Sequence, residues 1–149
     1  MGPRTTADPA LVDVLERLVV GAVGLTTVAL EEEGAAVELT FPQWRALVVV
    51  GERTSGIRVG LVAGRIGASV PATSRLLRRM EDRGLVRSAR DESDRRATLV
   101  GLTPSGSRVR RAIVARRRAL LVELVQGISL PPAAVPALSE LADAVARYA

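Results

Sequence analysis

Arginine carries the most distinctive chemistry in this sequence. Arg75, Arg78 and Arg79 stand within five consecutive positions, directly after Ser74. A guanidinium group is planar, always charged and able to donate two parallel hydrogen bonds, so it matches phosphate oxygens and the edge of guanine. All 21 basic residues are arginine, which is also what a GC-rich genome produces. The cluster therefore points to an anionic partner, while the choice of arginine over lysine has a simpler genomic explanation.

Covalent and metal chemistry have few residues to use here. The chain contains no cysteine and no histidine, which excludes disulfides, thiolate metal sites, thiol redox sensing and an imidazole base. No pairing of a nucleophile with a base is visible. Glu31, Glu32 and Glu33 are adjacent at an expected helix end, so their carboxylates point apart and make a poor metal site. We expect neither an enzyme nor a bound metal or cofactor.

Positive charge is concentrated in the middle of the chain. Fifteen arginines and six acidic residues lie between Arg45 and Arg111, a net charge of +9, whereas the remainder carries six arginines and ten acidic residues, a net charge of −4. Such a patch attracts polyanions. The apolar runs are shorter than the roughly 20 residues that cross a bilayer, and the segment from Met1 to Ala10 is unlike a signal peptide. We expect a soluble cytoplasmic protein with no membrane partner.

The arginine cluster lies on an expected helix with clear boundaries. Ser69 is a suitable N-cap, Pro71 fits the first turn, and the helix runs to Arg83 and ends at Gly84. A turn at Gly67 separates it from a weaker helix over residues 58–66. Two helices joined by a tight turn can place the second one in the major groove of DNA.

A β-hairpin is expected to follow this pair of helices. Residues 85–90 and 97–102 are short β-prone segments, separated by a polar loop at residues 91–96. A hairpin in this place forms the wing of a winged helix-turn-helix, and its loop can enter the minor groove. The sequence therefore favours double-stranded DNA as the partner.

Four further helices are expected around this unit. Apolar residues at helical spacing predict an amphipathic helix over residues 9–30, which ends near Gly34 in a left-handed residue. Thr40 and Gln43 form a capping box for a helix that reaches about residue 51. Near the C-terminus, residues 103–104 open a long helix to about residue 126, and a final helix follows residues 131–132.

The first and the last two of these helices carry apolar stripes that lie outside a winged-helix core. A lone amphipathic helix would leave its stripe in water, so a homodimer is expected. The predicted fold is mainly α, a winged helix-turn-helix with a two-stranded β wing and N- and C-terminal dimerisation helices. The expected parts of one intertwined domain are residues 1–38 for the first dimerisation helix and linker, 39–103 for DNA binding, and 104–149 for the last dimerisation helices.

The chain closely resembles the MarR family of bacterial transcriptional regulators, whose members are winged-helix homodimers. The similarity covers nearly the whole chain, and the order of its landmarks is specific. The matching segments are Leu39-Thr40-x-x-Gln43-Trp44, the helix-turn-helix from Val59 to Arg83, Gly84-Leu85-Val86, Asp94-Arg95-Arg96, and Leu102-Thr103-Pro104-x-Gly106.

The resemblance implies how DNA would be read. It places a DNA-reading helix at Pro71–Arg79 and a wing in which Arg96 enters the minor groove while Asp94 orients it. It implies a regulator of neighbouring genes, more often a repressor than an activator, on a pseudo-palindromic operator. The expected DNA-binding residues are Ser69, Pro71, Ala72, Ser74, Arg75, Arg78, Arg79, Asp94, Arg95 and Arg96.

The resemblance also implies a small-molecule pocket between the DNA-binding part and the dimer helices, often for phenolic or aromatic anions. Without cysteine, peroxide sensing through a thiol is excluded. Phe41, Trp44 and Tyr148 are the only aromatic residues, so a stacking pocket is poorly supplied. Trp44 and Val48 are the candidate contacts to an effector, although a place in the core is the simpler interpretation of Trp44.

Each arginine site has a simpler alternative. The cluster over residues 74–79 could be a solvated helix face, and Arg96 could pair with Asp94 or Asp91 in an exposed ion pair worth about 0 to 1 kcal/mol. Residues 116–118 are three consecutive arginines that spread around their helix, and we interpret them as solvated or paired with glutamates near Glu31. The alternative function is a winged-helix adaptor that binds proteins without specific DNA recognition.

Overall fold

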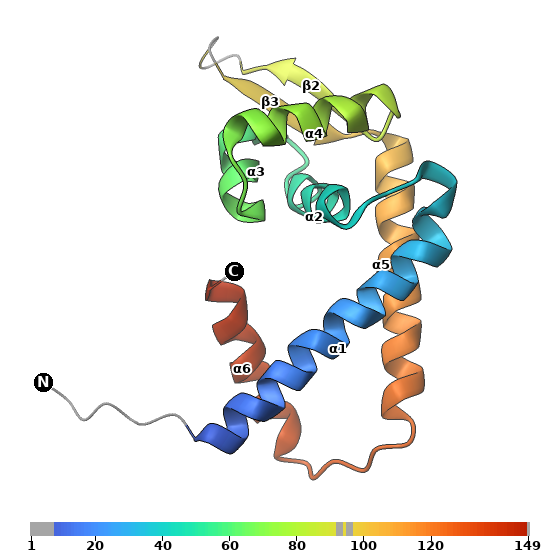
Figure 1. Ribbon diagram of the computed structural model, residues 1–149, viewed down its shortest axis with the longest axis vertical. Coiled ribbons are helices and arrows are strands. Elements are labelled where there is room, and N and C mark those ends of the chain that lie inside the picture. Colours follow the sequence, from blue (N-terminus) through green and yellow to red (C-terminus); the bar gives the residue numbers. More distant parts are fainter. Residues whose placement is uncertain (1–7, 92–93, 95–96, 149) are drawn as a thin grey trace, which may run out of the picture.

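The structure is a computed structural model and describes residues 8–91, 94 and 97–148. It is mainly helical, with one small sheet (Figure 1). The wing, the helix-turn-helix and the flanking helices follow the predicted order. The elements are α1 (Pro9–Gly34), the 3-10 helix η1 (Ala35–Val37), α2 (Phe41–Val50), β1 (Ile57–Arg58), α3 (Val59–Ile66), α4 (Val70–Asp82), β2 (Val86–Arg90), β3 (Thr98–Leu102), α5 (Pro104–Val125) and α6 (Ala134–Tyr148).

Side-chain caps set the starts of α2 and α5 as the sequence predicts. The backbone N–H of Thr40 donates to Oε1 of Gln43 at 3.0 Å, which completes the capping box of α2. The hydroxyl of Thr103 accepts from the N–H of Gly106 at 3.0 Å at the start of α5. Each cap satisfies an N–H that has no partner inside its helix.

The end of α1 differs from the prediction. Gly34 is right-handed, with φ −96°, and the left-handed residue is Glu38, with φ 46°. The chain continues past Gly34 into η1 before it turns, and the N–H of Glu38 donates to the carbonyl of Ala35 at 3.0 Å. Gly34 instead provides close packing, because a Cβ there would lie 3.1 Å from a methyl carbon of Leu30.

The sheet has three antiparallel strands in the order β1-β3-β2. The predicted hairpin of β2 and β3 is confirmed, with Val86 opposite Leu102 and Arg90 opposite Thr98. The third strand, β1, pairs Ile57 with Val100 and is an addition to the predicted two-stranded wing. Two residues are too few to show the alternation by which a strand is recognised in a sequence.

Buried residues define one part of the molecule, which we call the lobe (residues 26–113). Its core draws fully buried side chains from five helices and the sheet, including Ala29, Leu47, Val62, Met80, Val100 and Ile113. The lobe includes the end of α1 and the start of α5, so the core crosses the boundaries expected near residues 38 and 103. Those boundaries stay a prediction.

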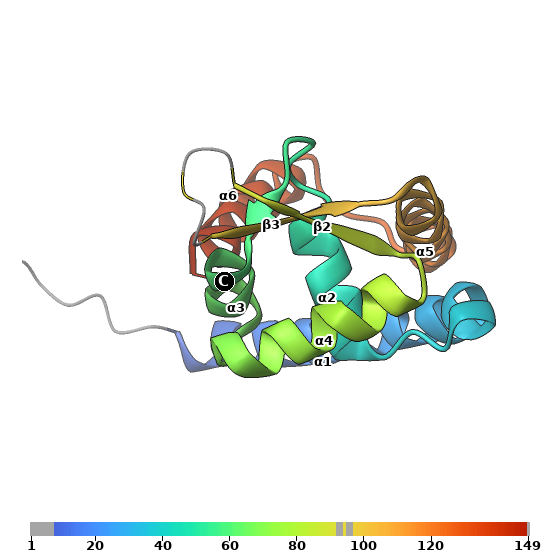
Figure 2. The same ribbon diagram turned by 90° about the horizontal axis from the view of Figure 1, so that it is seen from above.

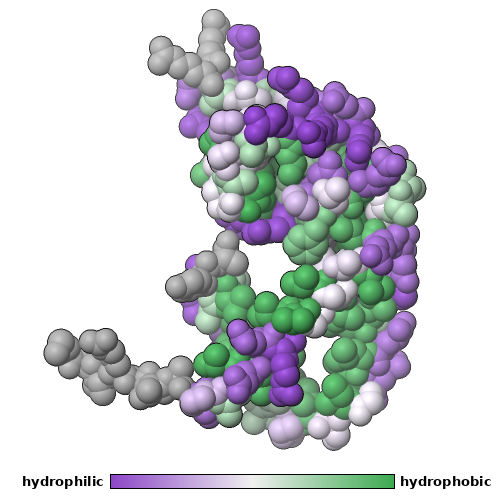
Figure 3. All heavy atoms as spheres, in the orientation of Figure 1, coloured by the Kyte–Doolittle hydropathy of each residue, from purple (hydrophilic) through white to green (hydrophobic). Residues whose placement is uncertain are grey.

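The rest of the described helices form what we call the arm (residues 9–25 and 114–147). No residue of the arm is buried. Leu18, Val20, Val135 and Leu138 are each 46 to 71% exposed. In Figure 3, hydrophobic surface gathers over the helices of the arm, whereas the surface over α4 and the wing is mostly hydrophilic. No helix among the described residues has the length and apolar character that a membrane span requires.

Candidate nucleic-acid interface

Helix α4 divides its residues between the core and the solvent. Thr73, Leu77 and Met80 are buried, which anchors the helix on α2, α3 and the sheet. Figure 2 looks onto the other side, where α4 lies beside the β2–β3 hairpin with no element covering it. The residues of the predicted reading face, Ser74, Arg75, Arg78 and Arg79, are all exposed on that side.

The start of α4 is built as the sequence predicts. The hydroxyl of Ser69 accepts from the N–H of Ala72 at 3.4 Å, and Pro71 lies in the first turn. Ser69 and Pro71 are exposed and Ala72 is half-buried. Ser74 donates its hydroxyl hydrogen to the carbonyl of Val70 at 2.9 Å, so its oxygen is directed as an acceptor. The positive end of the helix dipole lies at this exposed start.

Glu81 of α4 is bonded to the neighbouring strand rather than to the arginine cluster. The carboxylate of Glu81 accepts from the backbone N–H of Ser88 at 2.6 Å and from its hydroxyl at 3.1 Å, which ties the C-terminal turn to β2. Within the described part of the chain, Arg75, Arg78 and Arg79 form no ion pair. Their guanidinium groups keep their full charge available to an external anion.

Three hollows among the described residues are lined by α4, and two of them include residues of the predicted reading face. One, of about 360 Å³, lies between α4 and the start of α2, and Arg75, Arg79 and Arg83 line its α4 side. The other, of about 450 Å³, lies between α4, α3 and the base of the wing, and Ser74 and Thr98 line it. Helix α4 therefore protrudes between these two hollows. This surface shape suits insertion of the helix into a DNA groove, between its two phosphate backbones.

The C-terminal end of α4 is held from two sides. Beyond the link of Glu81 to β2, the guanidinium of Arg83 donates to the carbonyls of Val37 at 3.1 Å and Glu38 at 2.9 Å. These bonds connect the reading helix to the turn between α1 and α2. Arg83 was not among the predicted site residues, because its partners lie 45 and 46 positions away in the sequence.

The wing extends the positive surface beside α4. Arg87 and Arg90 on β2 are exposed. The loop is closed at its base by a bond from the N–H of Asp91 to the carbonyl of Ala97 at 3.0 Å, and the N–H of Ala97 donates to the carbonyl of Asp94 at 2.8 Å. Asp94 is exposed at the loop. Arg95 and Arg96 lie outside the described residues, so their predicted DNA contacts stay predictions.

One ion pair at the base of the wing was missed in the sequence. Nε and one terminal nitrogen of Arg58 donate to the same carboxylate oxygen of Asp91 at 2.9 and 2.7 Å. Asp91 is only 8% exposed. Arg58 occupies the N-cap position of α3, where a side chain that accepts hydrogen bonds is normally favoured, whereas the sequence had placed it inside the expected helix.

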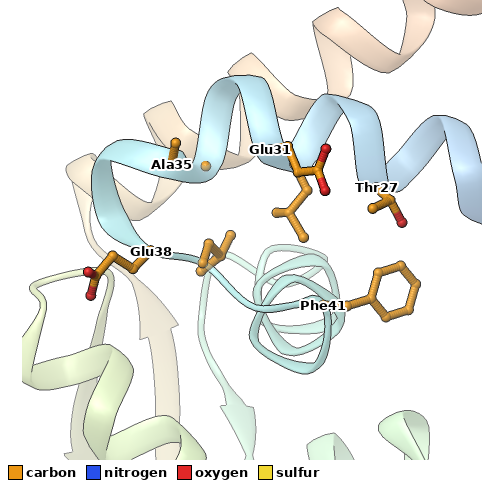
Figure 4. A pocket seen from close by; sticks show the side chains of 8 residues that line it. Thr27, Glu31, Ala35, Glu38 and Phe41 are labelled. Carbon is orange, nitrogen blue, oxygen red and sulfur yellow. The ribbon is translucent and has the colours of Figure 1, made fainter.

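The two candidate effector contacts lie away from the hollows described here. Trp44 is 3% exposed and belongs to the core, and Val48 packs against that core. A separate cavity of about 410 Å³ lies between α1 and the start of α2. Figure 4 shows Thr27 and Glu31 of α1 on the side toward which the ring of Phe41 extends, with Glu38 at the far end. The effector role of Trp44 and Val48 stays a prediction.

One arginine of the run on α5 pairs with a glutamate near Glu31, as predicted. Nε of Arg116 forms an ion pair with the carboxylate of Glu32 on α1. Nη1 of Arg116 lies 3.7 Å from a carboxylate oxygen of Glu123. The hydrogen bonds from Arg116 lower the pKa of the Glu32 carboxyl from its usual value. The described residues contain no group of three or more side chains suited to hold a metal ion.

Comparison with known proteins gives consistent matches. A model of the MarR family matches residues 38–97. The uncharacterized HTH-type transcriptional regulator YfiV of Bacillus subtilis (strain 168) is 30% identical over 100 residues, which are 67% of this chain and 60% of YfiV. The aligned part of the chain spans 56 to 60% of the length of the curated relatives that it matches.

Two solved structures show the same fold over nearly the whole chain. CouR from Rhodococcus jostii RHA1, bound to p-coumaroyl-CoA, is 27% identical with a TM-score of 0.71, over 95% of both chains. FabT from Streptococcus pneumoniae, in complex with DNA, is 18% identical with a TM-score of 0.73, over 95% of this chain and 100% of FabT.

Proposed function

The chain belongs to the MarR family of winged-helix transcriptional regulators, and on that premise we propose that it represses genes as a homodimer bound to a pseudo-palindromic operator in double-stranded DNA. The family and the matched relatives are transcriptional regulators rather than enzymes. The observation that carries the proposal is the exposed arginine face of α4, which forms no ion pair within the described residues and stands between two hollows.

In the proposed complex, α4 enters the major groove with its N-terminal half toward the bases. Arg75 donates two hydrogen bonds to a guanine or to a phosphate. Arg78 and Arg79, further along the helix, contact phosphates and fix the register. The wing reaches the adjacent minor groove, where Arg96 enters and Asp94 orients it, because a narrow A·T-rich groove concentrates negative potential.

The arm supplies the proposed dimer contact. Its exposed apolar residues, among them Leu18 on α1 and Val135 on α6, would be withdrawn from water by a second copy of the chain. A two-fold dimer presents two copies of α4, and its half-sites should lie about 10 base pairs apart or a multiple of that. The pseudo-palindrome of the operator follows from the symmetry of the protein.

Release by a small molecule is the proposed means of regulation. CouR, which shares the fold at 27% identity, is bound to p-coumaroyl-CoA. In the present chain, we place the effector between the lobe and the arm, near Trp44 and Val48. A bound molecule that favours a different spacing of the two copies of α4 would lower the affinity for the operator.

The test begins with selection of bound fragments from the genome that encodes the protein. Affinity for a selected fragment is then measured over a range of salt concentrations. Arg75→Ala should weaken binding by about 1 to 3 kcal/mol if the contact to guanine is bidentate, whereas Arg117→Ala, on α5, should change it little. Equal binding by both variants would contradict the assignment of the reading face.

The same experiment separates the regulator from an adaptor that binds only proteins. Specific DNA binding should give a strong salt dependence and a preference for selected fragments over random DNA. If no fragment were enriched and affinity did not depend on sequence, the adaptor would be the better interpretation.

A further inference from the structure

We propose that Arg58 is a positioning residue for DNA binding, which fixes the base of the wing against the helix-turn-helix through its ion pair with Asp91. The inference rests on the proposed function, since it assigns a role within the same interface. It concerns the angle between the two DNA-contacting parts, the reading helix α4 and the wing, rather than a contact to DNA by Arg58 itself.

The position of Arg58 in the chain is the first observation. Arg58 is the N-cap of α3, and its side chain makes no capping bond. Arginine has only donors, so it cannot accept a hydrogen bond from the first N–H groups of the helix. A serine or threonine at an N-cap typically stabilises a helix by about 1 kcal/mol relative to alanine. Arg58 gives up this local stabilisation and bonds instead to a residue 33 positions away.

The environment of Asp91 is the second observation. A buried carboxylate is costly unless it is paired and hydrogen-bonded, and Asp91 is 8% exposed. Arg58 donates two hydrogen bonds to it, whereas its own side chain is 47% exposed. The solvation that Asp91 loses by burial is therefore replaced in part by a charged partner from the other side of the wing.

The place of Asp91 in the hairpin turns this pair into a link between elements. Asp91 directly follows β2, and its N–H closes the wing loop onto Ala97. On the opposite side, Arg58 joins β1 to α3, the first helix of the helix-turn-helix. The pair thus connects the root of the wing loop to the helices that carry the reading face.

The sheet alone attaches β1 weakly to the base of the wing. β1 contributes only two residue pairs with β3, at Ile57 and Arg58. The hollow of about 450 Å³ between Arg58, Ser74 and Ala97 leaves the base of the wing without direct packing on α4 at this point. The ion pair of Arg58 with Asp91 restricts the movement of the wing relative to α4. Less conformational freedom is therefore lost when the wing and α4 both bind DNA.

The experiment compares two single variants and their combination with a matched ion pair on the same helix. Asp91→Asn leaves the arginine charge in place, and Arg58→Thr removes the pair and supplies an N-cap. The control is the exposed pair of Arg65 with Glu52, bonded at 2.9 and 3.1 Å, through Arg65→Thr and Glu52→Gln. Operator affinity is measured for the full-length protein, together with amide hydrogen exchange of the protein without DNA.

We expect Asp91→Asn and Arg58→Thr each to weaken operator binding by about tenfold, and the double variant to be no worse than either single one, as coupled residues behave. The exchange of the N–H of residue 91, which bonds to the carbonyl of Ala97, should accelerate in both variants, while that of core residues such as Val100 stays slow. The two control variants should keep the affinity within about threefold and leave the N–H of residue 91 protected.

Three outcomes are decisive against the inference or its premise. If Arg58→Thr lost affinity while Asp91→Asn bound like the wild type, Arg58 would be a direct phosphate contact, and positioning would be wrong. If the N–H of residue 91 kept its protection in both variants, the pair would not hold the wing. If the wild type bound no operator at all, the proposed function would fail, and the exchange of this N–H would still decide whether Arg58 holds the wing.

Discussion

The lobe and the arm contain similar side chains in opposite environments. Leucine and valine are plentiful in both, yet Leu47 and Val50 of the lobe are fully buried, whereas Leu18 and Val20 of the arm are 53 and 71% exposed. The lobe surrounds its apolar residues with α2, α3, α4, the sheet and parts of α1 and α5. The arm has two long helices and α6, whose apolar faces have no such cover (Figure 1).

This difference separates what a single chain can stabilise from what needs a second copy. Burial of apolar area stabilises the lobe within one chain, and its reading face is held by bonds such as those of Glu81 and Arg83. The arm exposes area that would gain stability only on association. DNA contact and assembly are therefore assigned to different parts, and each can be disturbed separately.

The largest effect should follow a change in the core of the lobe. Met80 is fully buried on the inner face of α4, so Met80→Ala should leave a cavity and lower the free energy of unfolding by about 2 to 5 kcal/mol. Met80→Leu, which nearly conserves volume, should cost less than about 1.5 kcal/mol. Urea unfolding followed by circular dichroism measures both. Similar values for the two variants would mean that the lobe does not depend on this packing.

The next effect should appear in assembly rather than in folding. Light scattering of the wild type should give about twice the chain mass of 15.8 kDa, and Leu18→Asp should shift it toward the single-chain value, because a charge cannot be buried in an apolar contact without a partner. The helical signal of the lobe should persist. Arg17→Asp adds the same side chain at a neighbouring exposed position and serves as the control.

A wild type that stayed monomeric at micromolar concentration would contradict the dimer and the operator with two half-sites. An assembly that tolerated Leu18→Asp would mean that another surface joins the two copies. Either result would change the role assigned to the arm without touching the fold of the lobe.

Local signals in the sequence predicted most of the lobe. The cap at Ser69, the capping box of Thr40 with Gln43, and the start at Thr103 are patterns within four residues, so they are readable without knowledge of the fold. The amphipathic pattern of α4 likewise predicted that Met80 lies on its buried face and Arg75 on its exposed face. These features depend on neighbours along the chain, and the structure has them where the sequence indicated.

Features that depend on distant partners were missed. β1 is too short for a pattern, and its pairing with β3 joins residues more than 40 positions apart. The link between Arg58 and Asp91 and the bonds of Arg83 to Val37 also join distant segments. The left-handed conformation of Glu38 was assigned to Gly34, because a glycine is the usual sign of such a residue.

A smaller effect is expected at the wing, where the contact to DNA depends on sequence. Arg96→Ala should weaken binding most on operators with A·T-rich flanks, because a narrow minor groove attracts arginine more strongly. Asp94→Ala should give a milder loss by releasing the orientation of Arg96. Affinity is measured on paired operators that differ only in their flanks. Equal losses on both operators would make Arg96 a phosphate contact, and unchanged affinity on both would remove the wing from the interface.

The smallest effect concerns the junction of lobe and arm, where Glu32 pairs with Arg116. Hydrogen bonds from Arg116 lower the pKa of Glu32 below its usual value in the folded protein. The folded state therefore binds this proton less readily than the unfolded state does, so the stabilisation is fully present above the unfolded pKa, about 4.3. It is lost as the pH falls through the lower pKa of the folded state.

Unfolding by urea at pH 6 and at steps down to pH 3 tests this junction. The difference in stability between the wild type and Glu32→Gln should be small, since the pair is exposed to solvent and screened. That difference should shrink further as the pH falls below about 4.3, because the carboxyl is then protonated first in the unfolded state and, below its lower pKa in the folded protein, in both states. Glu33→Gln removes a charge at the neighbouring position, which forms no ion pair within the described residues, and serves as the control. A difference that stayed constant over this range would mean that packing of the side chain, rather than its charge, joins α1 to α5.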